Sequence, residues 1–423
     1  MAIFYDNTFM FSIVVNFSIK RNMGILAVNQ STPSINLLFL KFLFSSFIQI
    51  VLAFSKKSSV IISDKQWKVE GSRMKILIIG GTNFIGPYVI RQLHDMGYHD
   101  ITLFHRGKTE VDLPFTVKHI YGDKMHLEQH KAAFQSLSPD VVVDMIAYTE
   151  TDIEPILHTF RGITKRLVMI SSQDVYRAYG VVRQADNGPL EPLPISEDSA
   201  VRNNRYPYQD PAKNPDDWCN RYDKIPLEEI VMNDPYLTAT VVRLPAVYGP
   251  NDPQHRLFHY FKLKPLHNDR PFILLDEGYA NWHWSHGYVE DVAYGIALAI
   301  TNERAAGRIY NIAELQTRTM LDFIQAIGDQ LDWQGEIIQV PSGHLPDELG
   351  IPLRTQQNII VESSRVREEL GYRETFSFKE GLKKTIEWEL AHLPEEIDHD
   401  HDNDDATLNE LRKAGVISTN QFS

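Results

Sequence analysis

From Met74 onward, short apolar runs alternate with helical patterns along most of the chain. The expected strands are Lys75–Ile79, Ile101–Phe104, Val117–Tyr121, Val141–Met145, Leu167–Ser171 and Ala239–Arg243. Apolar residues at helical spacing fill most of the gaps, for example at Gly86–Met96 and His126–Gln135. Right-handed crossovers between parallel strands place helices on both faces of a sheet. The pattern therefore predicts an α/β protein with a doubly wound parallel Rossmann sheet.

Three later segments, at about 181–220, 249–285 and 335–375, lack this periodicity and are irregular or rich in proline. We expect them to build a smaller C-terminal substrate lobe over the strand ends, where ligands bind in open α/β sheets. Sheet and lobe together would occupy residues 74–393. Residues 394–423 predict a flexible acidic tail; loose cation chelation by His399 and His401 is the alternative.

The first 73 residues differ in composition from the rest of the chain. Residues 35–54 form an apolar run that is long enough to span a bilayer, and Lys56 and Lys57 follow it. Lys41 interrupts the run. We expect Met74 to be the natural start of the protein, because the first strand begins at the next residue. A genuine membrane anchor that carries a cytoplasmic domain is the alternative.

Composition narrows the functional classes. The single cysteine, Cys219, excludes an internal disulfide framework and favours a reducing compartment, for which we take the cytoplasm. The formal net charge is −13, and residues 1–73 hold eight Lys/Arg against three Asp/Glu, a net of +5, which leaves −18 for residues 74–423. This negative charge on residues 74–423 argues against nucleic acid as a partner.

A glycine-rich turn follows the first expected strand and precedes the first expected helix. It reads Gly80-Gly-Thr-Asn-Phe-Ile-Gly86. Glycine lets the chain turn sharply and lets bare backbone approach a pyrophosphate, which the N-terminus of the helix then attracts. This context predicts a dinucleotide site shaped by Gly80, Gly81 and Gly86 and lined by Thr82, Asn83, Phe84 and Ile85. Asn83 stands where glycine is usual, and asparagine best imitates its left-handed conformation.

The type of dinucleotide is read after the second strand, where a carboxylate holds the ribose of NAD and a basic residue accepts the 2′-phosphate of NADP. No acid occurs there before Glu110, and His105, Arg106 and Lys108 favour NADP over NAD. Ordinary solvated cations are the alternative. Asp123, after the third strand, would accept a hydrogen bond from the adenine amino group or close an Asx turn.

Several motifs occur together in one order, and with them the chain resembles the NAD-dependent epimerase/dehydratase family, an extended or atypical kind of short-chain dehydrogenase/reductase. Besides the glycine turn, they are Ser171-Ser-Gln-Asp-Val-Tyr176, Arg243-Leu-Pro-Ala-Val-Tyr-Gly-Pro250, Gly287-Tyr-Val-Glu-Asp-Val-Ala293 and Tyr310-Asn-Ile312. The resemblance extends from Met74 to about Ala391 and implies an oxidoreductase.

The resemblance also implies a serine, a tyrosine and a lysine that process a hydroxyl or keto group. A tyrosine with a pKa near 10 is a poor base at neutral pH, and a nearby ammonium favours its phenolate. Ser172 and Lys224 stand at the family's positions, but Asn220 stands where the tyrosine is expected. Asp223 suits an N-cap, and an extended approach to that helix would place Tyr222 on the same side as Lys224. Tyr222 is therefore the proton-transfer candidate, with a catalytically crippled site as the alternative.

Two departures from the family pattern bear on the substrate. Ala246 replaces an asparagine that is usual in nucleotide-sugar members, and 281–287 lacks a usual arginine. In that segment His283 and His286 would contact an anionic substrate when protonated, and the two tryptophans between and before them would stack on a sugar or base. A packed strand with one wet face is the alternative.

The remaining site candidates are assigned by position. Ala147 and Tyr148, after the fourth strand, would border the nicotinamide, and Lys224 would hold its ribose. Further substrate candidates are Gln173, Asp174 and Arg256. The histidine pair lacks a third ligand, so we expect no metal site.

The sequence thus favours an NAD(P)-dependent epimerase, dehydratase or reductase. Its substrate would be a sugar-like small molecule, either free or linked to a nucleotide. The alternative is an impaired NAD(P)-binding regulator or an RNA-associated protein that resembles the chloroplast stem-loop-binding proteins. The family resemblance further implies a homodimer.

Overall fold

The computed structural model describes residues 74–209, 214, 217–259, 261, 270–346, 349–394 and 401–417. The apolar run 35–54, with the rest of residues 1–73, lies outside them. Among the described residues, no helix combines the length and the apolar character needed to cross a membrane.

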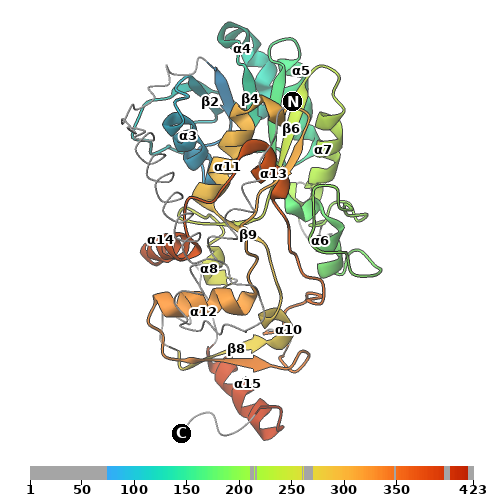
Figure 1. Cartoon of the computed structure of the whole chain (residues 1–423), viewed down its shortest axis with the longest axis vertical. Coiled ribbons are helices and arrows are strands. Elements are labelled where there is room, and N and C mark those ends of the chain that lie inside the picture. The colour runs from blue at the N-terminus through green and yellow to red at the C-terminus, as the bar shows by residue number, and fades with distance from the viewer. Residues whose placement is uncertain are drawn as a thin grey trace, which may run out of the picture. The chain divides into compact units, whose positions relative to one another are not determined.

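A seven-stranded parallel sheet forms the centre of the described chain (Figure 1). Its order is β10-β6-β5-β4-β1-β2-β3. The strands are β1 (Ile76–Ile79), β2 (Ile101–His105), β3 (Lys118–Tyr121), β4 (Val141–Asp144), β5 (Arg166–Ser172), β6 (Thr238–Leu244) and β10 (Ile309–Asn311). The order reverses between β1 and β4, and such a switch point opens a crevice at the carboxyl ends of the strands. The predicted doubly wound parallel sheet is confirmed.

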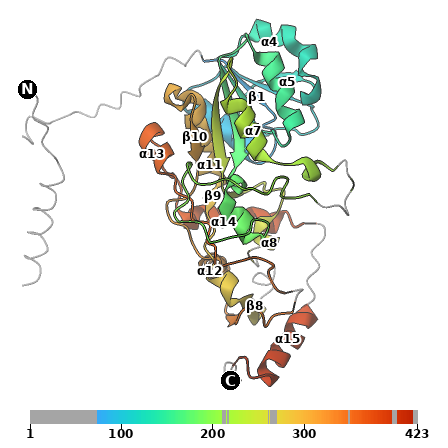
Figure 2. The same ribbon diagram turned by 90° about the vertical axis from the view of Figure 1, so that its right-hand side faces the viewer.

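Helices cover both faces of this sheet, as the two views show (Figures 1 and 2). Residues Ile76 and Ile78 of β1 point into one apolar layer, together with α3 (Ile85–Asp95) and α11 (Val289–Thr301). Leu77 and Ile79 point into the other. That second layer holds α4 (Lys131–Leu137), α5 (Glu150–Phe160) and α7 (Lys224–Met232). The unbroken apolar run of β1 is therefore explained by burial on both faces.

Smaller elements surround the carboxyl ends of the strands. Two short parallel pairs form there, β7 (Ala246–Tyr248) with β9 (His286–Tyr288), and β8 (Phe272–Asp276) with β11 (Glu336–Val340). The accompanying helices are α6 (Arg177–Val182), α8 (Arg256–His259), α10 (Glu277–Ala280), α12 (Met320–Gln330) and α14 (Phe378–Ala391), whereas α13 (Ser364–Leu370) lies elsewhere on the sheet. Short 3₁₀ turns lie at η1 (Lys124–His130), η2 (Gln173–Val175), η3 (Trp218–Arg221) and η4 (Glu303–Ala305).

Two segments differ from the sequence prediction. Part of the expected flexible tail is helix α15 (His401–Lys413), which packs on β8 with Leu408 and Leu411 buried in a separate apolar cluster. The many acidic residues of this helix obscure the two apolar positions, three residues apart, that it buries. Helix α13, which belongs to the expected lobe segment 335–375, instead packs on β10 and η4.

Candidate functional site

The glycine turn joins β1 to α3 in a conformation that requires glycine. Gly80 and Gly81 have φ values of 82° and 81°, in the left-handed region that side chains disfavour. A Cβ at Gly86 would lie only 2.3 Å from the backbone of Gly81. The turn therefore brings bare backbone to the N-terminus of α3, an arrangement suited to a pyrophosphate.

The left-handed residue of the turn is not Asn83, as expected from the sequence, but its neighbour. Phe84 has a φ of 44°, whereas Asn83 is not among the residues with positive φ. The Asn83 side chain instead accepts a hydrogen bond from the backbone N–H of Phe84 at 3.0 Å. Asparagine thus stabilises the turn through its side chain and does not imitate glycine.

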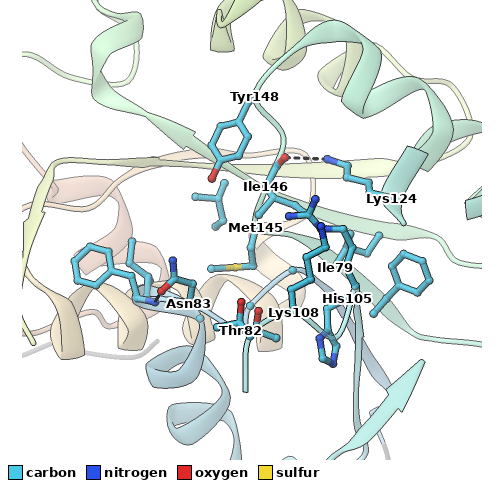
Figure 3. A pocket seen from close by; sticks show the side chains of 18 of the residues that line it. Ile79, Thr82, Asn83, His105, Lys108, Lys124, Met145, Ile146 and Tyr148 are labelled. Carbon is cyan, nitrogen blue, oxygen red and sulfur yellow. Dashed lines mark hydrogen bonds between the residues drawn. The ribbon is translucent and has the colours of Figure 1, made fainter. Parts of the chain in front are cut away.

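A cavity of about 690 Å³ opens above this turn. Its size lies within the range of small-molecule and cofactor sites. Figure 3 shows side chains from several strand ends around it. The candidates from the sequence that line the cavity are Gly80, Gly81, Thr82, Asn83, Phe84, Ile85, Gly86, His105, Arg106, Asp123, Tyr148 and Arg256.

Basic residues mark the end of the cavity beyond β2. His105, Arg106 and Lys108 line it, and no carboxylate occurs between Asp100 and Glu110. His105 forms a ring-to-ring hydrogen bond with His119 of 2.8 Å, and burial, reinforced by His119, lowers the pKa of His105. Of the alternatives for Asp123, the Asx turn is present, because one carboxylate oxygen accepts the N–H of Met125 at 3.0 Å.

A buried ion pair whose lysine lines the cavity was not anticipated from the sequence. Lys124 Nζ lies 2.9 Å and 3.1 Å from the two carboxylate oxygens of Asp144, and it also donates to the carbonyl of Ile146 at 3.1 Å (Figure 3). Asp144 is fully buried at the end of β4. The sequence does show an aspartate at the end of an apolar strand. Its partner could not be inferred, because Lys124 comes from η1, 20 residues earlier in the chain.

Lys224 is the first residue of α7, and Asp223 caps this helix by accepting the N–H of Ile225 at 3.1 Å. Lys224 does not line the cavity, but its Nζ donates to the carbonyl oxygens of Ala147 and, at 3.1 Å, of Ile170, which does. Burial lowers the pKa of Lys224 to about 8. Its ammonium is thus held against the cavity wall, and Ala147 contributes its backbone oxygen.

The expected serine and tyrosine lie together beside this lysine. The Tyr222 ring is 5.8 Å from Lys224 Nζ, so the extended approach to α7 does place the two on one side. Burial raises the pKa of Tyr222 well above its ordinary value, the carboxylate of Asp174 raises it further, and a hydrogen bond with Ser172 acts in the opposite direction. Tyr222 itself does not line the cavity and is only 8% exposed.

Behind these residues lies a buried polar network. Arg243 pairs with Glu228 at 2.6 Å and donates to the hydroxyl of Tyr176 at 2.9 Å. Tyr176 in turn donates to Asn311 at 2.7 Å. The arginine, the Tyr176 motif and the Tyr310-Asn-Ile312 motif are therefore joined in one network that fixes the ends of β5, β6 and β10.

The substrate candidates do not all meet at the cavity. Arg256 lines it and bonds to Asp252 at 2.6 Å. Asp174 is buried near Tyr222 with one carboxylate oxygen unpartnered among the described residues. Gln173 is fully buried, and its amide donates to the carbonyl of Ile312 at 2.8 Å.

The two histidines do not line the cavity either. His286 is buried among aromatic rings, and burial lowers its pKa to about 3, so it is neutral at physiological pH and offers no charge to an anion. His283 stands between Trp282 and Trp284, whose stacked rings have their centres 5.4 Å apart. Trp282 Nε1 donates to the carbonyl of Gln357 at 2.7 Å. The packed-strand interpretation therefore describes this segment.

Within the described part of the chain, no group of three His, Cys, Asp or Glu side chains is placed to hold a metal ion.

Comparisons with known proteins agree with this geometry. The chain is 24% identical over 360 residues to chloroplast stem-loop binding protein of 41 kDa b from Arabidopsis thaliana, covering 80% of this chain and 85% of that protein. It is 24% identical to dTDP-glucose 4,6-dehydratase of Salmonella typhimurium, over 75% and 93% of the two chains. The fold matches that of Thermus thermophilus UDP-glucose 4-epimerase in complex with NAD with a TM-score of 0.52 and 19% identity, over 76% of this chain and all of that one.

A family model adds the decisive match, because it covers more than half of the chain. The NAD dependent epimerase/dehydratase model aligns with residues 76–313, which include the glycine turn, Ser172, Lys224 and the polar network behind them. The chain therefore belongs to the NAD-dependent epimerase/dehydratase family.

Proposed function

We propose that the protein is an NAD(P)-dependent epimerase, dehydratase or reductase that acts on a hydroxyl or keto group of a sugar-like substrate. The observation that carries the proposal is the position of Lys224, whose ammonium bonds to the carbonyl of Ile170 in the wall of the dinucleotide cavity. Ser172 and Tyr222 lie beside it. A cavity next to a cation and hydroxyl groups is what hydride and proton exchange with a carbonyl requires.

The residues present fit a dinucleotide. Gly86 leaves no room for a side chain where a pyrophosphate would approach the N-terminus of α3, and Arg106 and Lys108 provide positive charge at the far end of the cavity. The bound dinucleotide would supply or accept the hydride. Ala147 and Tyr148 would border its nicotinamide end, and the Lys224 ammonium would favour negative charge on a neighbouring oxygen.

The test is a titration with NADPH and NADH, followed by a turnover screen with nucleotide sugars and small ketones. We expect binding and turnover in the full chain, and we expect Lys224→Met to lower kcat by about 100-fold or more. Lys384→Met, at an exposed lysine of α14, is the matched control and should leave turnover unchanged. Tight binding without turnover on any class of substrate would contradict the proposal.

We further propose that NADP is preferred over NAD, a choice supported by Arg106 and Lys108 at the end of the cavity and by the missing carboxylate after β2. NADPH should bind about tenfold more tightly than NADH, since a 2′-phosphate gains charge-assisted contacts. Arg106→Ala should abolish most of this difference and leave the affinity for NADH unchanged. Tighter binding of NADH by the unaltered chain would overturn the preference.

The alternative of an impaired regulator or RNA-associated protein is not favoured. One relative is named as a stem-loop binding protein. However, residues 74–423 of this chain carry a net charge of −18, which opposes RNA binding. A cytoplasmic location and a homodimer stay predictions, and sedimentation of the full chain tests the second.

A further inference from the structure

Two tyrosines, not one, flank the ammonium of Lys224. The ring centre of Tyr148 lies 4.8 Å from Lys224 Nζ, and that of Tyr222 lies 5.8 Å away. They come from different places in the fold. Tyr148 belongs to the loop between β4 and α5, whereas Tyr222 lies two residues before the first residue of α7. Both rings therefore lie beside the same cation.

The two rings differ in access to the cavity. Tyr148 lines the cavity and is 39% exposed, and Figure 3 shows its hydroxyl directed from the loop into that space. Tyr222 is 8% exposed and does not line the cavity. Its ring is enclosed by the rings of Tyr148, Tyr208 and Trp218, at centre distances of 6.4, 5.2 and 5.9 Å. A substrate in the cavity meets Tyr148 before it meets Tyr222.

The hydroxyl of Tyr222 already has Ser172 and Asp174 as hydrogen-bonding neighbours. By contrast, no hydrogen bond to the hydroxyl of Tyr148 occurs within the described residues. The backbone around Tyr148 is held firmly, because Lys224 Nζ donates to the carbonyl of Ala147 and the N–H of Asp223 donates to the carbonyl of Tyr148 at 3.3 Å. The segment that carries the lysine thus also fixes the loop that carries the accessible tyrosine.

We propose that Tyr148 is the residue that exchanges a proton with the substrate, and that Tyr222 is a positioning residue that orients Ser172. The assignment rests on the proposed function. In the reductive direction, a bound reduced dinucleotide would supply the hydride that forms the C–H bond, and the Tyr148 hydroxyl would give its proton to the carbonyl oxygen to form the O–H bond. Tyr148 is left as a phenolate beside Lys224 and regains a proton from water at its exposed face.

The first arm of the test compares Tyr148→Phe with Tyr222→Phe in the full chain. Tyr148→Phe should lower kcat by about 100-fold or more, as loss of a general acid does, with the Kd for the dinucleotide within about twofold of the unaltered chain. Tyr222→Phe should have a smaller effect, of about tenfold, since Ser172 only loses its orientation. Tyr236→Phe, at a tyrosine that is 67% exposed and remote from the cavity, is the control and should change nothing.

The second arm does not depend on turnover. Tetranitromethane nitrates accessible tyrosines, and mass spectrometry of peptides locates the modified rings. Tyr148 should be nitrated in the free protein and protected by saturating dinucleotide, whereas Tyr222 should stay unmodified and Tyr236 should be modified in both states. Nitration of Tyr222 in preference to Tyr148 would contradict the assignment.

The outcomes separate this inference from the proposed function. If the unaltered chain turns over substrate and Tyr148→Phe retains more than about half of kcat, Tyr148 is not the proton-transfer residue although the proposed function stands. If the unaltered chain turns over no substrate, both are overturned. A Tyr148→Phe chain that binds dinucleotide normally has folded, so its loss of turnover is then a loss of chemistry.

Discussion

At the scale of single residues, Gly81 lies too close to Gly86 to leave room for a side chain there. A Cβ at Gly86 would meet the backbone of Gly81 at 2.3 Å, so Gly86→Ala must displace the turn that approaches the dinucleotide. We expect this variant to weaken NADPH binding by at least about tenfold, since backbone contacts to the pyrophosphate are lost. Fluorescence titration measures the effect.

Gly97, just beyond the other end of α3, provides the control. It has a φ of 91° with open space around its Cβ position, so Gly97→Ala introduces backbone strain of about 1 kcal/mol without a clash. Its Kd for NADPH should therefore equal that of the unaltered chain. Equal binding by Gly86→Ala would show that the turn does not contact the dinucleotide.

The pKa of Lys224 sets a pH dependence. Burial lowers this pKa to about 8, so the ammonium that favours a neighbouring phenolate is lost as the pH rises through that value. We expect kcat to fall above about pH 8 in the unaltered chain. Lys224→Arg keeps its charge and should lack this fall. A kcat of the unaltered chain that stays level to about pH 9.5 would exclude the lysine from the chemistry.

At the scale of elements, the sequence predicted the strands and the turn that short local patterns specify. The six strands expected from apolar runs are present, and the glycine turn lies at the junction where its spacing placed it. The proximity of Tyr148 to Lys224 could not be foreseen, because the two residues meet only where the loop after β4 approaches the start of α7. Helix α15 was missed since two buried leucines among acidic residues carry little signal.

The junction of β4 with η1 depends on the buried pair of Asp144 and Lys124, whose side chains are 0% and 8% exposed. Lys124→Met leaves a buried carboxylate without its cation and should destabilise the protein by about 3 kcal/mol. Adding Asp144→Asn removes the uncompensated charge and should restore at least half of that loss. Urea unfolding measures both variants.

An exposed pair at the starts of β2 and β3 serves as the comparison. Lys118 and Asp100 lie 2.7 Å apart with side chains 65% and 32% exposed. Lys118→Met should therefore change the free energy of unfolding by less than about 1 kcal/mol. If Lys124→Met were as mild as Lys118→Met, the buried pair would not hold η1 to the sheet.

At the scale of the whole described molecule, the C-terminal helices are tied back to the cavity. The loop from Asp252 to Arg256 lines the cavity, and His255 within it lies 2.6 Å from Glu389 of α14. The His255 ring stacks on Trp388, which also stacks on His392. Residues near the end of the chain therefore support the wall of a site whose glycine turn lies near its start.

The burial of Glu389 makes stability depend on pH in a direction opposite to that of most carboxylates. Burial raises the pKa of Glu389 to about 7, so between about pH 4.5 and 7 the folded protein binds more protons at this group than the unfolded chain does. Its contribution to the free energy of unfolding therefore falls as the pH rises, by about 3 kcal/mol, with His255, Asp252 and Arg256 as the charged neighbours. Glu389→Gln removes the titration, so the difference between the two chains in urea unfolding should shrink steadily from about pH 7 toward pH 5. A constant difference across that range would show that Glu389 is already ionised in the folded protein and that His255 holds it by charge alone.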